Sequence, residues 1–176
     1  AFPSNTSTWL ANGMVSQQSF ASFTSINQID DSCIVEPILD VCAGRGGKSL
    51  ILKERGVVDL IAADFSISRL RQLHPEAERL NLSPIPLVHL DASKPLPFTS
   101  SFKTIVIDAP CSGLGVISRR PDSKYRLNQS SFSGLLQTQS AILHQAAKLL
   151  SPGGHIIYIT CSICPQENHQ QITSFL

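Results

Sequence analysis

The sequence predicts an α/β fold, a doubly wound and mostly parallel sheet with helices on both faces. From about residue 34 onward, short apolar runs alternate with amphipathic stretches of helical spacing. The apolar runs are nearly continuous, as in strands that are buried on both faces. Each run is closely followed by a residue capable of chemistry: Asp40, Asp64, Asp91, Asp108 and Cys161 after Thr160. Because ligands gather at the carboxyl ends of parallel strands, we expect these residues to share one functional edge.

The first half of the core is expected to contain two strands and two helices. The stretch 33–41 is rich in apolar and β-branched residues and runs into an acid and glycines, so it reads as a strand. A helix over 46–55 opens on those glycines, and VVDLIAAD at 57–64 is the second strand. Apolar residues at helical spacing predict a second helix over 66–81. Pro75 should kink or split it, because proline lacks an N–H group and clashes with the preceding turn.

The second half continues the alternation. IPLVHLD at 85–91 and FKTIVIDA at 102–109 are expected to be the third and fourth strands. Residues 133–150 place leucines, isoleucine and alanine on one helical face, which predicts a long amphipathic helix. Ser-Pro-Gly-Gly at 151–154 should end that helix, and HIIYIT at 155–160 is the fifth strand.

The 176 residues suffice for one compact domain. We expect residues 1–30 to be a lead-in segment that packs on the core, with a helix around 16–25, and residues 31–176 to be the core itself. The chain begins with Ala and ends with the apolar ITSFL, so we expect it to be a piece of a longer protein.

Composition narrows the class of protein. With 15% charged residues and ordinary apolar content, the chain is neither a disordered tail nor a fibre. No apolar run approaches the roughly 20 residues of a membrane span, so no membrane partner is expected. Five cysteines, an odd number placed in or beside apolar strands, favour a reducing cytoplasm over a disulfide framework. A net charge of +1 gives no strong field for nucleic acid, and the pattern does not indicate an oligomeric state.

DVCAGRGGKS, residues 40–49, lies between a predicted strand and a predicted helix. A phosphate-binding loop would need glycine where Cys42 stands, and a dinucleotide fingerprint would need glycine where Ser49 stands, so both fail on spacing. A third interpretation is S-adenosylmethionine, with the amino-acid end of the cofactor against the glycine backbone. Asp64, 24 residues after Asp40, would then take the ribose hydroxyls. A plain strand-to-helix turn remains open.

Two further segments each carry a thiol after a predicted strand: DAPCSGLGV, with RRPDSKY behind it, and YITCSICPQEN. Together with DVCAGRGGKS they resemble the RNA 5-methylcytosine methyltransferases of the RsmB/Sun group. The amino-acid sequences of these motifs are most similar to those of the bacterial members that act on 16S ribosomal RNA. The resemblance extends from GMVSQQSFAS, which begins at residue 13, to the end of the chain. Three motifs in this order and spacing are highly specific.

The resemblance implies a Rossmann-like methyltransferase core and covalent catalysis. C5 of cytosine is too weak a nucleophile to take a methyl group until a thiolate adds to C6. By resemblance Cys161 is that nucleophile, Cys111 assists release of the methylated product, and Asp108 contacts cytosine or cofactor. DNA cytosine methyltransferases, the enzyme alternative, would exchange the two thiol roles. A catalytically silent RNA-binding assembly factor of the same fold is the alternative that is not an enzyme.

The resemblance also assigns the cofactor and RNA contacts. Asp64 would bind the ribose, Asp91 the adenine side, and Asp108 the space between cofactor and base; for Asp64 and Asp91 a capping or turn role stays open. The methionine part would be wrapped by Cys42, Ala43, Gly44, Arg45, Gly46, Gly47 and Lys48. A basic cluster beside the first thiol is either a solvated face or a contact for RNA phosphates: Arg119, Arg120, Lys124 and Arg126.

The remaining features are expected to be structural. Cys33, Cys42 and Cys164 read as buried thiols, and C-x-x-C at 161–164 lacks the second pair that a zinc site needs, so no metal is expected. Glu167-Asn168 should cap the next helix.

The sequence departs from the family pattern at two positions: the family's usual proline is Arg45 here, and Gln18 replaces a common aspartate. We also expect the family's last two strands and its N-terminal RNA-binding domain to be missing, leaving a segment that binds cofactor but methylates RNA poorly.

Overall fold

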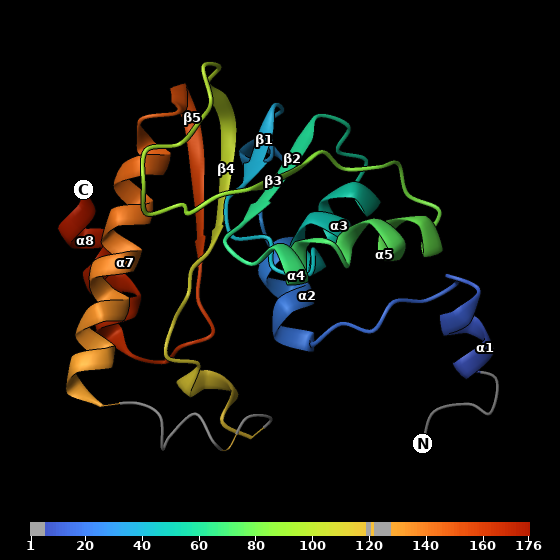
Figure 1. The fold of residues 1–176 in the computed structure, drawn as a ribbon, viewed down its shortest axis with the longest axis horizontal. Helices are drawn as coiled ribbons and strands as arrows, with labels where there is room; N and C mark the ends of the chain where they lie inside the picture. The colour runs from blue at the N-terminus through green and yellow to red at the C-terminus, as the bar shows by residue number, and fades with distance from the viewer. Residues whose placement is uncertain (1–5, 119–120, 122–127) are drawn as a thin grey trace.

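The computed structural model describes residues 6–118, 121 and 128–176. Five strands form one all-parallel sheet in the order β3-β2-β1-β4-β5, which confirms the predicted α/β class (Figure 1). Chain order reverses beside the central β1, which pairs with β2 on one side and with β4 on the other. Such a reversal opens a crevice at the carboxyl ends of the two strands. The strands are β1 Ile38–Asp40, β2 Leu60–Asp64, β3 Leu87–His89, β4 Phe102–Asp108 and β5 Leu150–Ile159.

Helices cover both faces of this sheet. Figure 1 shows α7 and α8 at the β4-β5 side and α2 to α5 beside β1, β2 and β3. The α-helices are α1 Thr6–Ala11, α2 Phe20–Asn27, α3 Gly47–Glu54, α4 Ile67–Leu70, α5 Leu73–Arg79, α7 Gln129–Ala147 and α8 His169–Phe175. Three 3₁₀ turns complete the described elements: η1 Asp31–Cys33, η2 Leu114–Val116 and η3 Pro165–Glu167. None of the helices in the described part of the chain has the length and apolar character that crossing a bilayer requires.

Successive strand residues supply two separate cores, because their side chains point to opposite faces of a sheet. Ile38 and Val106 are fully buried among the side chains of α3 and α5. Leu39 and Ile105, their neighbours in the chain, are fully buried on the other face against α7. The doubly covered sheet explains why these strands are nearly all apolar in sequence.

The first strand is shorter than the predicted 33–41. The hydroxyl of buried Thr104 accepts the N–H of Val35 at 2.9 Å and lies 3.1 and 2.8 Å from the carbonyl oxygens of Cys33 and Val35. The Thr104 hydroxyl thus takes the hydrogen-bonding place that a neighbouring strand would take for the backbone of residues 33–35. Pro37 also offers no N–H to a sheet ladder, so pairing starts at Ile38.

Two predicted helices differ in extent from the observed ones. The 66–81 stretch is split as expected, but the break falls after Leu70 and before α5 begins at Leu73. Pro75 then lies in the first turn of α5, where a backbone N–H needs no helical partner. The long helix begins earlier than predicted, at Gln129, because Asn128 and Ser131 form a reciprocal cap.

The long helix also ends earlier than predicted, so the expectation that residues 151–154 separate helix from strand was wrong. Helix α7 stops at Ala147, and β5 already begins at Leu150. The N–H of Phe102 donates to the carbonyl oxygen of Leu149 at 2.8 Å, and Phe102 pairs with Leu150 across an irregular register. The last residues of the predicted helix therefore pair with β4 and are not helical.

Ahead of the core, α1 was not predicted, whereas the helix expected at 16–25 is present as α2 at Phe20–Asn27. The side chain of Ser19 accepts the N–H of Ser22 at 3.1 Å and so fixes the start of α2. Ile26 of α2 is fully buried in the core that α3 shares. This packing brings the α2 serines to the carboxyl edge of the sheet.

Candidate active site

The predicted polar residues gather at the carboxyl edge of the sheet. Strands β1, β2 and β4 end at Asp40, Asp64 and Asp108. Asp91 follows two residues after β3, and Thr160 follows directly after β5. Because all five strands are parallel, all these positions lie at one end of the sheet.

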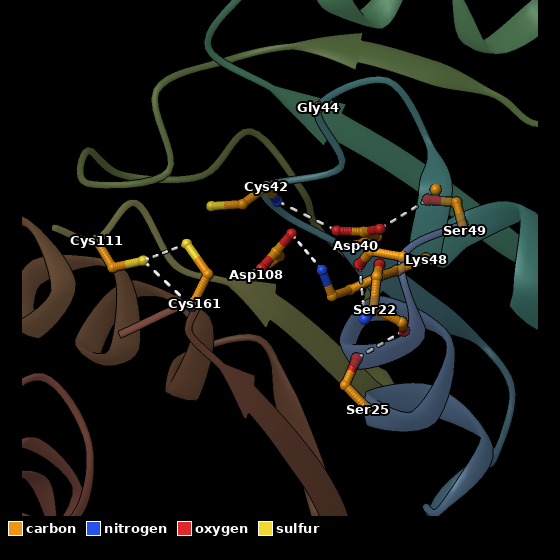
Figure 2. Close-up of polar contacts among 12 residues, drawn as sticks. Ser22, Ser25, Asp40, Cys42, Gly44, Lys48, Ser49, Asp108, Cys111 and Cys161 are labelled. Atoms are coloured by element: carbon orange, nitrogen blue, oxygen red, sulfur yellow. Dashed lines mark hydrogen bonds and ion pairs between the residues drawn. The ribbon is translucent and has the colours of Figure 1, made fainter. Parts of the chain in front are cut away.

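The glycine loop between β1 and α3 is held by two carboxylates, one of which is Asp40, shown beside Cys42 and Ser49 in Figure 2. Asp40 is fully buried, accepts the hydroxyl of Ser49 at 2.6 Å and the N–H of Cys42 at 3.3 Å, and so faces the loop rather than a ligand. Burial raises the pKa of Asp40 to about 7, although the hydrogen bond from Ser49 opposes the rise. The N–H of Gly44 donates to Asp64 at 2.8 Å. Asp64 thereby joins the loop to the end of β2.

A first cavity of about 360 Å³ opens beside this loop. Four of the predicted cofactor residues line it: Cys42, Asp64, Asp91 and Asp108. Arg69 lies 3.1 Å from Asp64 in an ion pair. Hydrogen bonds from the hydroxyl and N–H of Ser93 lower the pKa of Asp91. Burial raises the pKa of the Cys42 thiol, which suits a neutral wall and no reactive role.

A second cavity of about 250 Å³ lies on the other side of Asp108. Its wall includes Ser22 of α2, Lys48 of α3 and Cys161 after β5. Asp108 lines both cavities, and its carboxylate is 2.5 Å from the ammonium group of Lys48. Figure 2 shows Asp108 between the thiols and Lys48, with Cys42 nearby. A ligand in each cavity would therefore meet the other beside this carboxylate.

The two predicted thiols are in contact. The sulfurs of Cys111 and Cys161 are 3.0 Å apart, and the N–H of Cys161 points to the Cys111 sulfur at 3.2 Å. Cys161 is exposed, and hydrogen bonding to Cys111 lowers its pKa to about 7. The same contact, with burial, raises the pKa of Cys111. An accessible thiolate beside a protonated thiol is an arrangement suited to nucleophilic catalysis.

The expectation that Glu167 and Asn168 cap α8 holds only for the position of Asn168, which is the N-cap residue of that helix, whereas Glu167 belongs to η3. No side-chain cap bond is made at the start of α8. Asn168 instead accepts the hydroxyl of Thr160 at 2.6 Å, and Glu167 is fully buried and accepts the N–H of Ser112 at 2.8 Å. Glu167 and Ser112 are 55 positions apart, so no local pattern could have paired them.

Some expectations fall outside what the structure describes. Arg119, Arg120, Lys124 and Arg126 of the predicted basic cluster lie outside the described residues. Within residues 6–118, 121 and 128–176, no group of three or more His, Cys, Asp or Glu side chains could hold a metal ion.

Gln18, at the position where the family often has aspartate, donates its side-chain amide to the carbonyl oxygen of Gly47 at 3.1 Å.

Comparison with curated proteins gives relatives with a shared name. Ribosomal RNA small subunit methyltransferase B of Shewanella oneidensis is 42% identical over 144 residues, which are 80% of this chain and 33% of the relative. The protein of the same name from Vibrio vulnificus is 38% identical over 167 residues, 93% of this chain and 39% of the relative. The chain thus spans about a third to two fifths of the length of these curated relatives.

Solved structures with similar folds also include proteins named as methyltransferases or their homologues. NSun6 from Pyrococcus horikoshii superposes with a TM-score of 0.83 at 27% identity, covering 98% of this chain and 45% of that one. A methyltransferase homolog protein from Pyrococcus horikoshii gives 0.78 at 26% identity, covering 97% and 54%. The family model described as 16S rRNA methyltransferase RsmB/F matches residues 30–176. On this match and the curated relatives, the chain belongs to the RsmB/F family of 16S rRNA methyltransferases.

Proposed function

We propose that this chain is the catalytic core of an enzyme that transfers a methyl group from S-adenosylmethionine to C5 of a cytosine in RNA. The observation that carries the proposal is the placing of two cavities on either side of Asp108, with Cys161 in the wall of the second. The first cavity takes the cofactor and the second takes the base. The shared carboxylate marks the place where methyl donor and acceptor meet.

The first cavity fits this cofactor in size and in chemistry. Its volume, about 360 Å³, lies within the range of small-molecule sites. Asp64 supplies a carboxylate for the ribose hydroxyls, and the exposed ring of Phe65 with Ala92 and Ile142 offers apolar surface for the adenine, beside Asp91. The loop from Cys42 to Lys48 surrounds the methionine part. When bound, S-adenosylmethionine supplies an electrophilic methyl group.

Cys161 is the nucleophile in this scheme. With its pKa lowered to about 7, a substantial share of it is thiolate near neutral pH. Addition of the thiolate to C6 moves an electron pair to C5, and that pair forms the bond to the methyl group as the bond between the methyl group and the sulfonium sulfur breaks, with its electron pair left on the sulfur. A water molecule then takes the C5 proton, the electron pair of that C–H bond restores the C5–C6 double bond, and the S–C6 bond breaks to return the Cys161 thiolate. Cys111, 3.0 Å away, assists this release.

Asp108 and Lys48 hold the two ligands in register. The carboxylate of Asp108 lies at the cavity junction, where it reaches the polar edge of a cytosine in the second cavity. Lys48, 2.5 Å away, fixes the orientation of that carboxylate. Because the thiolate must approach C6 from above the ring, the target base is single-stranded or flipped out of a helix.

Ribosomal RNA is the substrate that the family relationship favours. The curated relatives are named for the small subunit ribosomal RNA. The described residues near the cavities contribute few cations besides Lys48 and Arg69. Arg119, Arg120 and Lys124, which follow Cys111 in the sequence, would supply phosphate contacts, since RNA affinity depends strongly on such contacts.

A trapped adduct tests the proposal. Full-length Cys111→Ala protein is incubated with 16S ribosomal RNA and S-adenosylmethionine, and denaturing gels are used to detect a protein–RNA adduct. We expect the adduct to accumulate, because addition proceeds and release is impaired. It should vanish in Cys111→Ala/Cys161→Ala, whereas Cys33→Ala, a control distant from the site, should behave as the unaltered protein.

Other outcomes would redirect the assignment. Methylation that survives Cys161→Ala but not Cys111→Ala would exchange the thiol roles and point to the logic of the DNA enzymes. Absence of S-adenosylmethionine binding in calorimetry would instead indicate an assembly factor without turnover.

A further inference from the structure

Glu167 is a buried carboxylate that the proposed chemistry does not use. It ends η3, six residues after Cys161, and its side chain is fully shielded from solvent. Burying a charge without partners is very costly, so such a group is retained only with several hydrogen bonds. Glu167 has them: the N–H of Ser112 at 2.8 Å, the hydroxyl of Ser112 at 2.5 Å and the amide of Gln139 at 3.0 Å.

These bonds determine the charge state of Glu167. Burial, its largest single influence, raises the pKa of the carboxyl, but hydrogen bonds from Ser112, Ser162 and Gln139 together lower it below the ordinary value. The group is therefore a carboxylate at neutral pH. A charged acceptor makes hydrogen bonds roughly twice as strong as neutral ones, which makes Glu167 a firm anchor.

The anchor holds the loop that carries Cys111. Ser112 directly follows Cys111, and the Ser112 hydroxyl is also 3.1 Å from that of Ser162, which directly follows Cys161. Gln139 of α7, fully buried, donates to the carbonyl oxygen of Pro110 at 3.0 Å as well as to Glu167. Residues on both sides of Cys111 are thus tied to one carboxylate and its amide partner.

The second loop is joined to the first independently. The N–H of Gly115 donates to the carbonyl oxygen of Cys161 at 3.0 Å. A Cβ at Gly115 would lie 2.9 Å from that oxygen, so the approach requires glycine. The two loops therefore contact each other directly, and Glu167 holds the one that carries Cys111 through Ser112.

We propose that Glu167 is a positioning residue, which holds Cys111 against Cys161 through Ser112. This inference rests on the proposed function, because the thiol contact matters only where Cys161 reacts. It predicts a specific consequence: without the Glu167 anchor, Cys111 moves away and Cys161 loses the hydrogen bond that favours its thiolate. Among the described residues, the other charged groups that act on Cys161 are Asp108, which opposes thiolate formation, and Lys48, which favours it. We expect both to remain in place when Glu167 changes, because their ion pair does not involve Glu167.

The test measures the pH dependence of Cys161 alkylation by iodoacetamide, with peptide mass spectrometry to separate it from the other thiols. Glu167→Gln keeps the size of the side chain and removes its charge. We expect the midpoint of alkylation to rise by about one pH unit, a tenfold loss of thiol acidity. Glu78→Gln, the same exchange at an exposed position of α5, should leave the midpoint unchanged.

A Cys111→Ala background separates positioning from a general structural role, because alanine offers no hydrogen bond to Cys161. There the partner thiol is absent, so Glu167→Gln should no longer move the Cys161 midpoint. A shift of equal size in this background would overturn the proposal, as would an unmoved midpoint in folded Glu167→Gln. Should Glu167→Gln fail to fold, Ser112→Ala decides by the same criteria, since it removes only one donor to the anchor.

Failure here differs from failure of the proposed function. Alkylation needs neither RNA nor cofactor. An unmoved midpoint with normal adduct formation overturns the positioning role alone, whereas loss of the adduct in Cys111→Ala overturns the methyl-transfer scheme.

Discussion

Gly46 in the glycine loop gives the sharpest prediction for a single substitution. Its φ is +85°, in the left-handed region, and a Cβ there would lie 2.4 Å from Cγ and 2.6 Å from Cδ1 of Leu73. Leu73, the first residue of α5, is fully buried in the core that α3 shares, so its side chain has no free space to move into. Gly46→Ala therefore combines backbone strain with overpacking of the core.

The two costs can be separated by a matched substitution. Left-handed backbone costs an alanine about 1–2 kcal/mol, and overpacking a core adds about 1–3 kcal/mol. Gly56 has φ of +90°, and a Cβ added there would meet no atom within 4 Å, so Gly56→Ala has only the backbone cost. We expect Gly46→Ala to lower the free energy of unfolding by about 2–5 kcal/mol and Gly56→Ala by about 1–2 kcal/mol.

Urea denaturation followed by circular dichroism measures both losses. In a Leu73→Ala background most of the excess loss of Gly46→Ala should disappear, because Cγ and Cδ1 of Leu73 are gone and only its Cβ, at 3.2 Å, remains. Equal losses for the two glycine variants would refute the argument that Leu73 occupies the space beside Gly46. An excess that persists without the Leu73 side chain would refute it as well.

Three further predictions concern the carboxylates of the site. Lys48→Met should lower the methyl-transfer rate at least tenfold, with Lys48→Arg keeping part of it, because Asp108 loses its ion-pair partner; single-turnover assays would show it. Asp64→Asn should weaken S-adenosylmethionine binding in calorimetry about tenfold or more, as a charged hydrogen bond is lost. For Asp40, whose pKa is raised to about 7 from 3.8, the folded form keeps a proton that the unfolded form has lost, so stability falls as pH rises from about 4 to about 7. Between pH 5 and pH 7 the free energy of unfolding should therefore fall by about 2 kcal/mol less in Asp40→Asn than in the unaltered protein. Urea denaturation at the two pH values measures this, and an equal fall in both proteins would contradict the raised pKa of Asp40.

Sequence was sufficient for the parts of the fold that depend on local pattern. A strand buried on both faces must be apolar, so the five strands and the residues after them could be predicted from runs such as LIAAD, which ends at Asp64. The parallel arrangement then placed Asp40, Asp108 and Thr160 at one edge without any structural knowledge. Recognising Cys111 and Cys161 needed the family resemblance as well.

What sequence missed depends on partners far along the chain. Leu149 and Leu150 fit the helical spacing of α7, but Phe102 of β4 draws them into strand pairing. The short α1 gives too little periodic pattern to predict. Glu167 looked like a helix cap because the deciding partner, Ser112, is 55 positions away. Local propensity has no access to such contacts.

The same geometry explains why two thiols 50 positions apart in sequence are in contact. Asp108, the last residue of β4, pairs with Ile159, the last residue of β5, so the two strands end level with one another. Adjacent strands are about 4.8 Å apart, and Cys111 and Cys161 follow these ends by three and two residues. Side chains at such positions meet only if both loops turn toward each other, which Gly115 permits and the Glu167 anchor maintains. The acidity of Cys161 is therefore a property of the β4–β5 junction as a whole, and substitutions behind the loops should change the chemistry without touching either ligand.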